Sequence, residues 1–298
     1  MAAARQILVI GKSGQVASAL DRLNGASSFA YRCAGRDEAD LTDPNSLAAT
    51  IEAARPDLVI NAAAYTAVDK AEEEPDLAHA VNAVGPAELA VLCQKHKLPL
   101  IHISTDYVFD GAGRKPYSVD HPINPLGVYG ASKAAGEAGV RQRLERHFIF
   151  RTAWVYDEAG RNFLNTMLRL GAERPLLRVV DDQIGSPTYA GDIAAALDMV
   201  AQAILDNDGA RLAGTYHLTN GGATSWHGFA AEIFAIAAGQ GGKVPRLEAI
   251  TTADYPTPAR RPAYSVLDMT LSEQMFSLRM APWQDALQRC MAAKPASV

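Results

Sequence analysis

The sequence has few cysteines and no long apolar run, and each shortage excludes a class of protein. Cys33, Cys93 and Cys290 are odd in number and far apart, and no Cys-x-x-Cys pair occurs, so neither a disulfide framework nor a zinc knuckle is predicted. The longest apolar runs, such as Leu58–Ala64, are far shorter than the roughly 20 residues that a membrane helix requires. Met1–Arg5 and the short apolar segment after it lack the pattern of a signal peptide. We therefore expect a reduced, cytoplasmic protein that does not span a membrane.

Neither acidic nor basic residues are in large excess. The 298 residues include 33 acidic and 28 basic side chains, and the net charge of -5 gives no broad attraction to nucleic acid or to an anionic membrane. An anionic ligand would therefore need a local cluster of arginine and lysine. A hydrophobic content of 48% with 20% charged residues is that of an ordinary globular enzyme and excludes global disorder.

Short apolar runs alternate with segments of helical period along the first half of the chain. We expect strands over residues 6–10, 30–34, 58–61, 100–105 and 148–152, and helices over residues 15–23, 44–54, 76–96 and 128–147. Asp43 occupies the N-cap position of the second helix, and Pro44 its first turn. Strict alternation predicts an α/β fold, a Rossmann-type doubly wound parallel sheet with crossover helices on both faces.

The second half of the chain loses this alternation after about residue 155, and proline and tryptophan appear in its loops. We expect an NAD(P)-binding Rossmann domain over residues 1–150. Residues 151–298 should form most of a smaller, mixed substrate-binding lobe, with segments that return to the first domain. Because ligands of such sheets bind beyond the carboxyl ends of the strands, the residues that follow the strands are the candidates for a site.

A glycine-rich turn, Gly11-Lys-Ser-Gly-Gln-Val-Ala17, follows the first expected strand and opens the first helix. Small residues are needed there because a pyrophosphate must approach the backbone N–H groups at the start of a helix. The turn is also similar to the end of an ATPase phosphate loop, but that motif needs a glycine where Gln6 stands. The context therefore favours dinucleotide binding over an ATPase loop and over a plain strand–helix turn.

The second strand ends in Ala34-Gly-Arg36, where a Rossmann protein holds the adenosine half of its cofactor. An acid there would bind the ribose hydroxyl of NAD, whereas a guanidinium suits the additional phosphate of NADP. NADPH is therefore allowed beside NADH as the cofactor. A solvated surface arginine is an equally consistent interpretation of Arg36.

Tyr129 and Lys133 lie four residues apart on an expected helix and so share one face. A tyrosine can give its proton to a carbonyl oxygen while hydride arrives at the carbon, although its ordinary pKa of about 10 is high for this work. A lysine cation on the same face would lower that pKa. Thr105, at the end of the fourth strand, adds a hydroxyl that can bond the same carbonyl oxygen or the tyrosine. The glycine turn, the threonine and the pair occur in the required order, which predicts reductive chemistry with a nicotinamide cofactor.

These motifs resemble those of the extended short-chain dehydrogenase/reductase superfamily and, more narrowly, those of the dTDP-4-dehydrorhamnose reductases. The matching segments span nearly the whole chain in order: Gly11–Val16, Asn61–Glu72, Ser104–Gly111, Tyr129–Lys133, Phe150–Tyr156, Gly185–Thr188 and Pro256–Pro262. The last segment is the distinctive one, because general sugar epimerases share the glycine turn and the Tyr/Lys pair but lack its arginines. The resemblance implies reduction of the C4 keto group of dTDP-4-dehydro-L-rhamnose by NADPH or NADH, to give dTDP-L-rhamnose.

The resemblance also implies a role for each matching position. The catalytic residues would be Thr105, Tyr129 and Lys133. Contacts to the nucleotide sugar would come from Thr105, Asp106, Trp154, Arg260 and Arg261. The cofactor would be bound by Gly11, Gly14, Gln15, Val16, Asp40, Leu41, Ala62, Ala63, Ala64, Tyr129 and Lys133. Core packing is an alternative for the tryptophan, and a surface ion pair is an alternative for the two arginines.

Two aspects of the resemblance leave alternatives. Some members of the family dimerise through Mg²⁺ held by acids, but Ala19 and Gly191 stand at those positions and nearby Asp192 is a weak substitute. We therefore expect no metal, and a monomer or a weak homodimer.

The same fold also serves other nucleotide-sugar reductases or epimerases, and a non-catalytic NADP-binding regulatory subunit of a methionine adenosyltransferase. Retention of the Thr–Tyr–Lys group argues against the regulatory subunit, because a binding module needs no tuned tyrosine.

Overall fold

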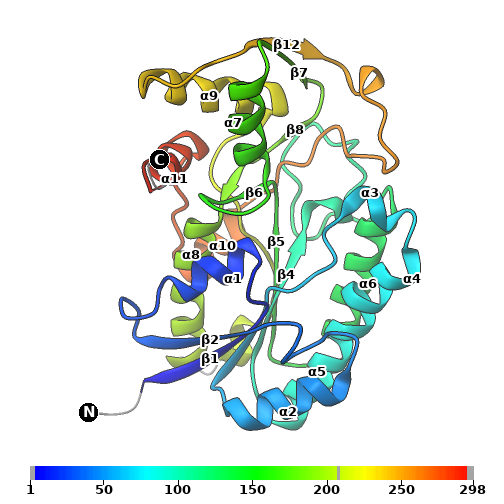
Figure 1. The fold of residues 1–298 in the computed structure, drawn as a ribbon. Coiled ribbons are helices and arrows are strands. Elements are labelled where there is room, and N and C mark those ends of the chain that lie inside the picture. The colour runs from blue at the N-terminus through cyan, green and yellow to red at the C-terminus, as the bar shows by residue number, and fades with distance from the viewer. Residues whose placement is uncertain (1–3, 207–208, 294–298) are drawn as a thin grey trace.

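Six parallel strands form the central sheet of the protein, whose computed structural model describes residues 4–206 and 209–293. Their order is β10-β5-β4-β3-β1-β2 (Figure 1). The bounds are β1 Arg5–Ile10, β2 Phe29–Ala34, β3 Leu58–Asn61, β4 Leu100–Thr105, β5 His147–Thr152 and β10 Gly214–His217. The direction of winding reverses between β1 and β3, so a crevice for a ligand is expected beyond the carboxyl ends of these two strands.

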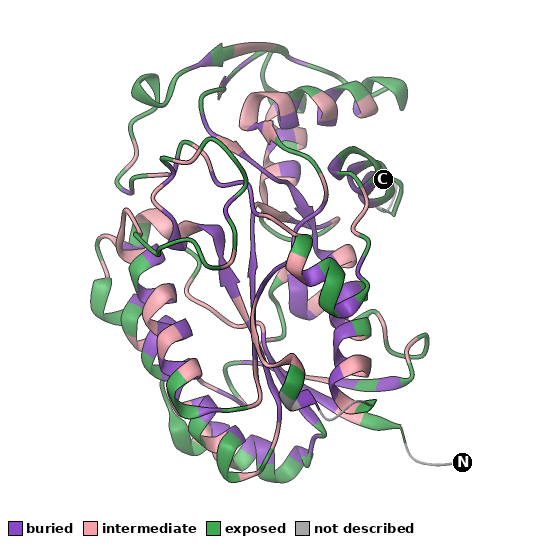
Figure 2. Ribbon diagram, turned by 180° about the vertical axis from the view of Figure 1, so that it is seen from behind, coloured by how far each residue is buried: buried purple, intermediate pink, exposed green. Residues whose placement is uncertain are grey.

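Helices cover both faces of this sheet. On one face lie α1 Gln15–Asp21, α8 Ala190–Asp206 and α10 Thr270–Phe276, and on the other lie α2 Pro44–Ala54, α5 Gly85–Lys95 and α6 Val128–Arg143. Each face has its own apolar cluster between strands and helices. Buried residues follow the strands and the inner sides of the helices, as Figure 2 shows. The predicted α/β fold with a doubly wound Rossmann-type sheet is confirmed.

Local sequence explains where several elements begin. Asp43 caps α2, because its carboxylate accepts a hydrogen bond of 3.0 Å from the backbone N–H of Asn45, and Pro44 fits the first turn. The single helix expected over residues 76–96 is divided. It consists of α4 Pro75–His79, a π-helical turn η1 Ala80–Val84, and α5. The turn holds buried Asn82, whose side chain bonds both backbone groups of Tyr65, so tertiary contacts override the regular helix here.

The helix expected over residues 128–147 is also shorter than predicted. It ends at Arg143, because the chain from His147 onward joins the sheet as β5. Sequence analysis also missed a short helix, α3 Val68–Ala71, between β3 and α4. This helix is the first element after β3, so it belongs to the edge of the sheet where a ligand is expected.

A smaller lobe lies above the sheet in Figure 1 and has its own aromatic core. Its helices are α7 Phe163–Glu173, α9 Trp226–Gly239 and α11 Trp283–Ala293. Its strands pair two by two: β6 Val155–Tyr156 with β9 Thr188–Tyr189, β7 Leu176–Val180 with β12 Arg246–Ile250, and β8 Ile184–Gly185 with β11 Thr224–Ser225. The predicted mixed character of the lobe is confirmed, whereas its role in substrate binding stays a prediction.

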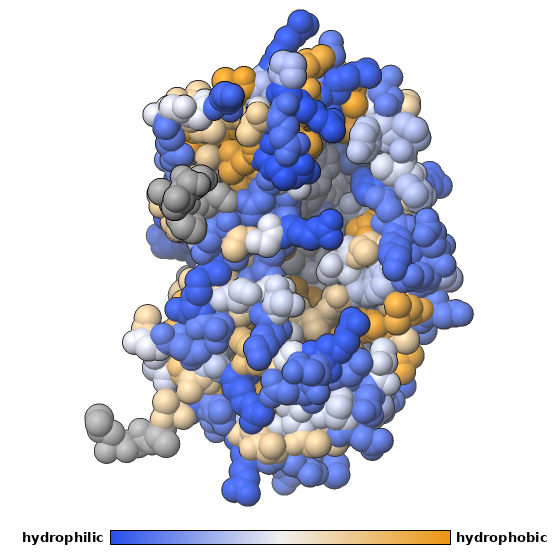
Figure 3. All heavy atoms as spheres, in the orientation of Figure 1, coloured by the Kyte–Doolittle hydropathy of each residue, from blue (hydrophilic) through white to orange (hydrophobic). Residues whose placement is uncertain are grey.

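The surface in Figure 3 is hollowed between this lobe and the sheet below it, and hydrophilic residues cover most of the face shown. Three short helical turns complete the elements: η2 Asp106–Val108, η3 Gly209–Leu212 and η4 Thr252–Asp254. Among the residues that the structure describes, no helix is both long and apolar enough to cross a membrane.

Candidate active site

The carboxyl end of β4 carries two buried polar residues, Thr105 and Asp106. Thr105 is the register neighbour of Thr152 on β5, and its hydroxyl donates a hydrogen bond of 3.0 Å to one carboxylate oxygen of Asp106. The other oxygen of Asp106, Oδ2, has no hydrogen-bond partner within the described part of the chain. Burial raises the pKa of Asp106 to about 6, although the hydroxyl groups of Ser265 and Thr105 near the carboxylate favour its charged form. A buried acid with a free oxygen can receive a hydroxyl of a ligand.

Helix α6 brings Tyr129 and Lys133 to the same place. The helix can approach η2 because residue 130 is glycine, and a Cβ there would overlap the backbone carbonyl of Tyr107. The rings of Tyr107 and Tyr129 meet edge to face with centroids 5.5 Å apart. Lys133 is buried, and its ammonium donates a hydrogen bond of 2.6 Å to the carbonyl of Ile103 on β4. The Thr105 hydroxyl lies near enough to the Tyr129 phenol to favour its phenolate. The structure thus brings the three predicted catalytic residues together.

The pKa values of this cluster differ from the sequence-based expectation. Burial raises the pKa of Tyr129 to about 12, opposed by the nearby Thr105 hydroxyl and reinforced by the charge of Asp106. Burial also lowers the pKa of Lys133 to about 8, against the charge of Glu137. Lys133 was expected to lower the pKa of Tyr129, but its ammonium is engaged by the β4 carbonyl and burial dominates both groups. With its raised pKa, Tyr129 is protonated at neutral pH, the form that a proton donor requires.

Two carboxylates that sequence analysis missed hold α6 in position. Glu72 accepts a hydrogen bond of 2.8 Å from the N–H of Val128, at the start of the helix that carries Tyr129. Glu137 is buried and accepts from Ser104 at 2.7 Å and from Arg151 at 2.9 and 2.7 Å. Burial alone would raise the pKa of Glu137, but Arg151 outweighs it and keeps the pKa below its usual value. Glu137 lies four residues after Lys133 on the same helix, and this spacing could have indicated it from the sequence. No neighbouring residue in the sequence indicates that Glu72 contacts α6.

The glycine turn lies at the switch point between β1 and β3. Gly11 has a φ of +120°, which favours glycine, and its N–H donates to the Ala34 carbonyl at 2.8 Å. A Cβ at Gly11 would lie 3.4 Å from backbone atoms of Ala62 and Ala63, so the turn lies against the residues that follow β3. Gly14 caps α1, and nothing lies within 4 Å of the place that its Cβ would take. A phosphate can therefore approach this backbone without meeting a side chain.

The next two residues of the turn have different surroundings. Val16 lies in the first turn of α1 and is buried, whereas the Gln15 side chain bridges to the smaller lobe. Its amide donates to the Val155 carbonyl at 3.2 Å and accepts from the Asn162 amide at 3.0 Å. The dinucleotide turn and the lobe are therefore linked by hydrogen bonds.

The two residues expected near the adenosine lie beyond β2. Asp40 accepts hydrogen bonds of 2.8 Å from the backbone N–H and the hydroxyl of Thr42, and these bonds hold the pKa of Asp40 below its usual value. Leu41 is buried against the start of α5, where a Cβ at Gly85 would overlap the Leu41 carbonyl. Ala64 follows Ala63 beyond β3 and is partly buried.

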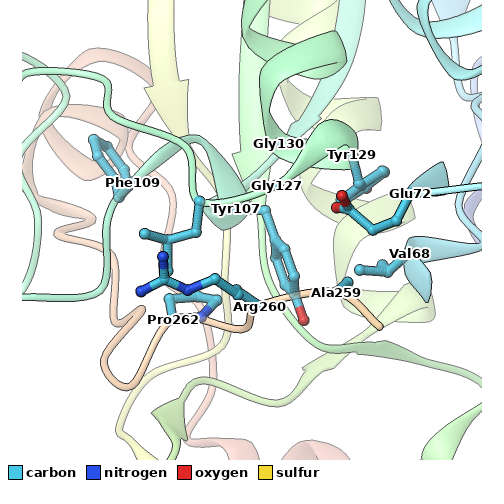
Figure 4. A pocket seen from close by; sticks show the side chains of 11 residues that line it. Val68, Glu72, Tyr107, Phe109, Gly127, Tyr129, Gly130, Ala259, Arg260 and Pro262 are labelled. Atoms are coloured by element: carbon cyan, nitrogen blue, oxygen red, sulfur yellow. The ribbon is translucent and has the colours of Figure 1, made fainter. Parts of the chain in front are cut away.

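The two predicted arginines have different environments. Arg261 forms a bidentate ion pair with Asp69 of α3, with N–O distances of 2.9 and 2.7 Å, and this pair fastens the arginine loop to the segment after β3. Arg260 is exposed and has no ion-pair partner in residues 4–206 and 209–293. Figure 4 shows Arg260 on one side of a pocket and Tyr129 with Glu72 on the other. Of the two guanidiniums, only that of Arg260 is available to an anion.

Trp154 follows the end of β5 and is partly buried. Its indole stacks face to face on that of Trp226, the first residue of α9, with ring centroids 3.4 Å apart. Because Thr152 of β5 neighbours Thr105 of β4, Trp154 belongs to the same edge of the sheet as the catalytic cluster. Sequence analysis missed Trp226, which lies far from its partner along the chain.

The positions considered for a metal are occupied by other interactions. Ala19 is buried in α1, and Gly191 lies against the Tyr189 ring. Asp192 is bound by the Arg289 guanidinium at 2.6 and 2.7 Å and by the Asn220 amide at 2.7 Å. Within the described ranges, no group of three or more His, Cys, Asp or Glu side chains could hold a metal ion. Metal independence itself stays a prediction.

A sheet with this topology, a glycine turn at its switch point and an adjacent Thr–Tyr–Lys cluster are the fold and site of an extended short-chain dehydrogenase/reductase. Residues 5–295 match the family described as RmlD substrate binding domain, and the chain belongs to that family. The curated dTDP-4-dehydrorhamnose reductase of Sinorhizobium fredii is 41% identical over 288 residues, covering 97% of this chain and 97% of the relative.

Solved structures with the same name are also similar to this chain. A dTDP-4-dehydrorhamnose reductase from Clostridium acetobutylicum superposes with a TM-score of 0.88 at 35% identity, covering 96% of this chain and 98% of that one. The enzyme from Bacillus anthracis, in complex with NADP, also gives 0.88 at 35% identity, covering 97% of this chain and 99% of that one. Full-length similarity of sequence and fold therefore agrees with the resemblance found in the motifs.

Proposed function

We propose that this protein reduces the C4 keto group of dTDP-4-dehydro-L-rhamnose to a hydroxyl group, giving dTDP-L-rhamnose, with NADPH or NADH as the reductant. The observation that carries the proposal is the meeting of Thr105, Tyr129 and Lys133 at the carboxyl end of β4 in a member of the RmlD family. The NADP bound to the Bacillus anthracis relative supports this cofactor class. Exposed Arg36, just beyond β2, suits the additional phosphate of NADPH.

The chain's own residues supply the proton and the electrostatic support. The nicotinamide, when bound, supplies a hydride to the carbonyl carbon. Tyr129 donates its phenolic proton to the carbonyl oxygen, so the C=O bond gains one hydride and one proton and becomes an alcohol. The nearby Thr105 hydroxyl then stabilises the phenolate that remains.

The cofactor would be held along the carboxyl edge from β1 to β4. Gly11 and Gly14 leave the backbone open to the pyrophosphate, with Gln15 and Val16 at the start of α1. The small side chains that follow β3, Ala62, Ala63 and Ala64, leave room for the nicotinamide ring. Asp40 and Leu41 would border the adenosine. Tyr129 and Lys133 would border the nicotinamide ribose.

The nucleotide sugar would lie between the catalytic cluster and the arginine loop. Arg260 is free to bind the diphosphate, while Arg261 fixes the loop through Asp69. The unpartnered oxygen of Asp106 can accept a sugar hydroxyl. Trp154 offers an indole face to the sugar ring. We also infer a cytoplasmic enzyme that acts without metal, as a monomer or a weak homodimer.

Turnover of synthetic dTDP-4-dehydro-L-rhamnose tests this function. The purified protein should consume NADPH or NADH, followed by the absorbance of the reduced nicotinamide, and should produce dTDP-L-rhamnose. UDP-glucose, incubated with NAD and the protein, is the control for a sugar epimerase. Epimerisation of UDP-glucose without reduction of the dehydro sugar would contradict the proposal.

A further inference from the structure

Two indole rings join the sheet to the smaller lobe. Trp154 follows β5 and Trp226 begins α9, and their rings lie 3.4 Å apart with an angle of 4° between the planes. The helix α9 belongs to the lobe that lies above the sheet in Figure 1. The stack therefore connects the end of a strand that borders the catalytic cluster with an element of the other part of the molecule.

The backbone at Trp154 has a conformation that bulky residues rarely adopt. Its φ is +46°, in the left-handed region, so the surrounding structure must hold it there. Trp226 supports one face of the indole. Gly185 leaves the space for its edge, because a Cβ at Gly185 would overlap the Trp154 ring. Packing on one face and along one edge thus fixes where this indole points.

Trp226 is itself anchored by the lobe. Its indole N–H donates a hydrogen bond of 3.2 Å to the side-chain oxygen of buried Gln183. The ring centroids of Phe163 and Trp226 are 4.7 Å apart. Both stacked indoles keep part of their surface accessible, whereas the third tryptophan, Trp283, is only 5% exposed in the lobe core. Accessible aromatic surface that is also rigidly held is suited to binding a ligand.

The stack borders the proposed sugar site from two directions. Trp154 lies two residues beyond Thr152, the register neighbour of Thr105. The strand that contains Gly185 is bonded to the segment after the arginine loop. The Ile184 N–H donates to the Ala263 carbonyl at 2.8 Å, and the Ile184 carbonyl accepts from Ser265 at 2.8 Å.

We propose that Trp226 is a positioning residue for substrate recognition, which holds the Trp154 indole as a rigid apolar wall for the C–H face of the deoxy sugar. This inference rests on the proposed function, because it needs a sugar at that edge of the sheet. Trp226 acts through Trp154 and needs no contact with the reacting atoms. Loss of the stack should therefore weaken sugar binding and leave cofactor binding intact.

Two variants displace the Trp154 indole in different ways, and a third tests partial support. Trp226→Ala deletes the supporting ring, and Trp226→Phe keeps part of it. Gly185→Ala leaves both rings in the chain but adds a methyl group where the Trp154 ring lies. The controls are Trp283→Phe, in the lobe core, and Gly239→Ala, where nothing lies within 4 Å of the added methyl group.

We expect Trp226→Ala and Gly185→Ala to raise the KM for dTDP-4-dehydro-L-rhamnose roughly three- to tenfold, the range of an aromatic pair. Trp226→Phe should recover part of this loss, and the Kd for NADPH should stay the same throughout. The circular dichroism couplet of the stacked indoles should disappear in Trp226→Phe and persist in Trp283→Phe. A purely structural role would reduce the yield of active enzyme but leave KM unchanged.

The two failures are distinguishable. A wild-type protein that does not reduce the dehydro sugar overturns the proposed function, and this inference falls with it. A wild-type protein that turns over while Gly185→Ala and Trp226→Ala keep KM within twofold overturns the inference alone. A KM that rises equally in both control variants also overturns it.

Discussion

Replacement of Lys133 by methionine should stabilise the protein at neutral pH while removing its activity. Lys133 is 2% exposed, and burial lowers the pKa of its ammonium from 10.5 to about 8. The folded protein thus holds this proton less tightly than the unfolded chain does. The charge therefore opposes folding fully below pH 8, and this penalty disappears as the pH rises from about 8 to 10.5.

The fall in the pKa of Lys133 corresponds to about 3 kcal/mol, at about 1.36 kcal/mol for each pH unit between 10.5 and about 8. The substitution also removes the hydrogen bond to the Ile103 carbonyl, which offsets about 1 kcal/mol. We therefore expect Lys133→Met to be more stable than the wild type by roughly 2 kcal/mol at neutral pH. Above the ordinary pKa of lysine it should be less stable by about 1 kcal/mol, because only the lost hydrogen bond remains.

Urea unfolding of the cofactor-free proteins, followed by circular dichroism at neutral and at alkaline pH, measures this difference. Groups that titrate in both proteins cancel in the comparison. Lys95→Met is the control, since the Lys95 side chain is exposed and its charge stays in water. A Lys133→Met protein less stable than the wild type at neutral pH would refute the reasoning, and so would a difference that does not change with pH.

The other predictions concern the proton donor, the arginines and the metal. Tyr129→Phe should lower kcat by on the order of a hundredfold with little change in cofactor Kd; activity within threefold of the wild type would remove Tyr129 from the mechanism. Arg260→Ala should raise the KM for the nucleotide sugar roughly tenfold to a hundredfold, measured beside the cofactor Kd, which should not change. Arg261→Ala should lower the free energy of unfolding in urea more than Asp69→Asn does, because Arg261 also bonds Thr257 and the Ala259 carbonyl; the loss in the double variant should be less than the sum of the two, because both variants break one ion pair. Activity and elution volume should be indifferent to EDTA and Mg²⁺; a Mg²⁺-dependent dimer would show that other acids bind the metal.

Features that depend on neighbouring residues were predictable from the sequence. The strands β3 and β4 have the expected bounds, because short apolar runs between polar segments fit a buried parallel sheet. The N-cap at Asp43 and the glycine turn at Gly11 follow from the chemistry of a few adjacent residues. Thr105 ends an expected parallel strand and the Tyr/Lys pair lies on the next expected helix, so the sequence also predicted that these residues meet at one edge of the sheet.

Features that depend on distant segments were not predictable. Glu72 caps α6 although it lies far from Val128 in the sequence, and Arg261 forms its ion pair with Asp69 of α3. The π-turn at Asn82 results from a bond to another loop, which no helical period shows. The raised pKa of Tyr129 likewise follows from burial, a property of the folded chain.

Hydride transfer to C4 of the sugar is the central claim, and an isotope measurement tests it most directly. NADPH that carries deuterium on one face of the nicotinamide is incubated with the protein and dTDP-4-dehydro-L-rhamnose, and the same is done with the other face labelled. We expect dTDP-L-rhamnose with deuterium at C4, seen by nuclear magnetic resonance, from one labelled cofactor and not from the other. Product without deuterium from both cofactors, or deuterium at any carbon but C4, would contradict the account.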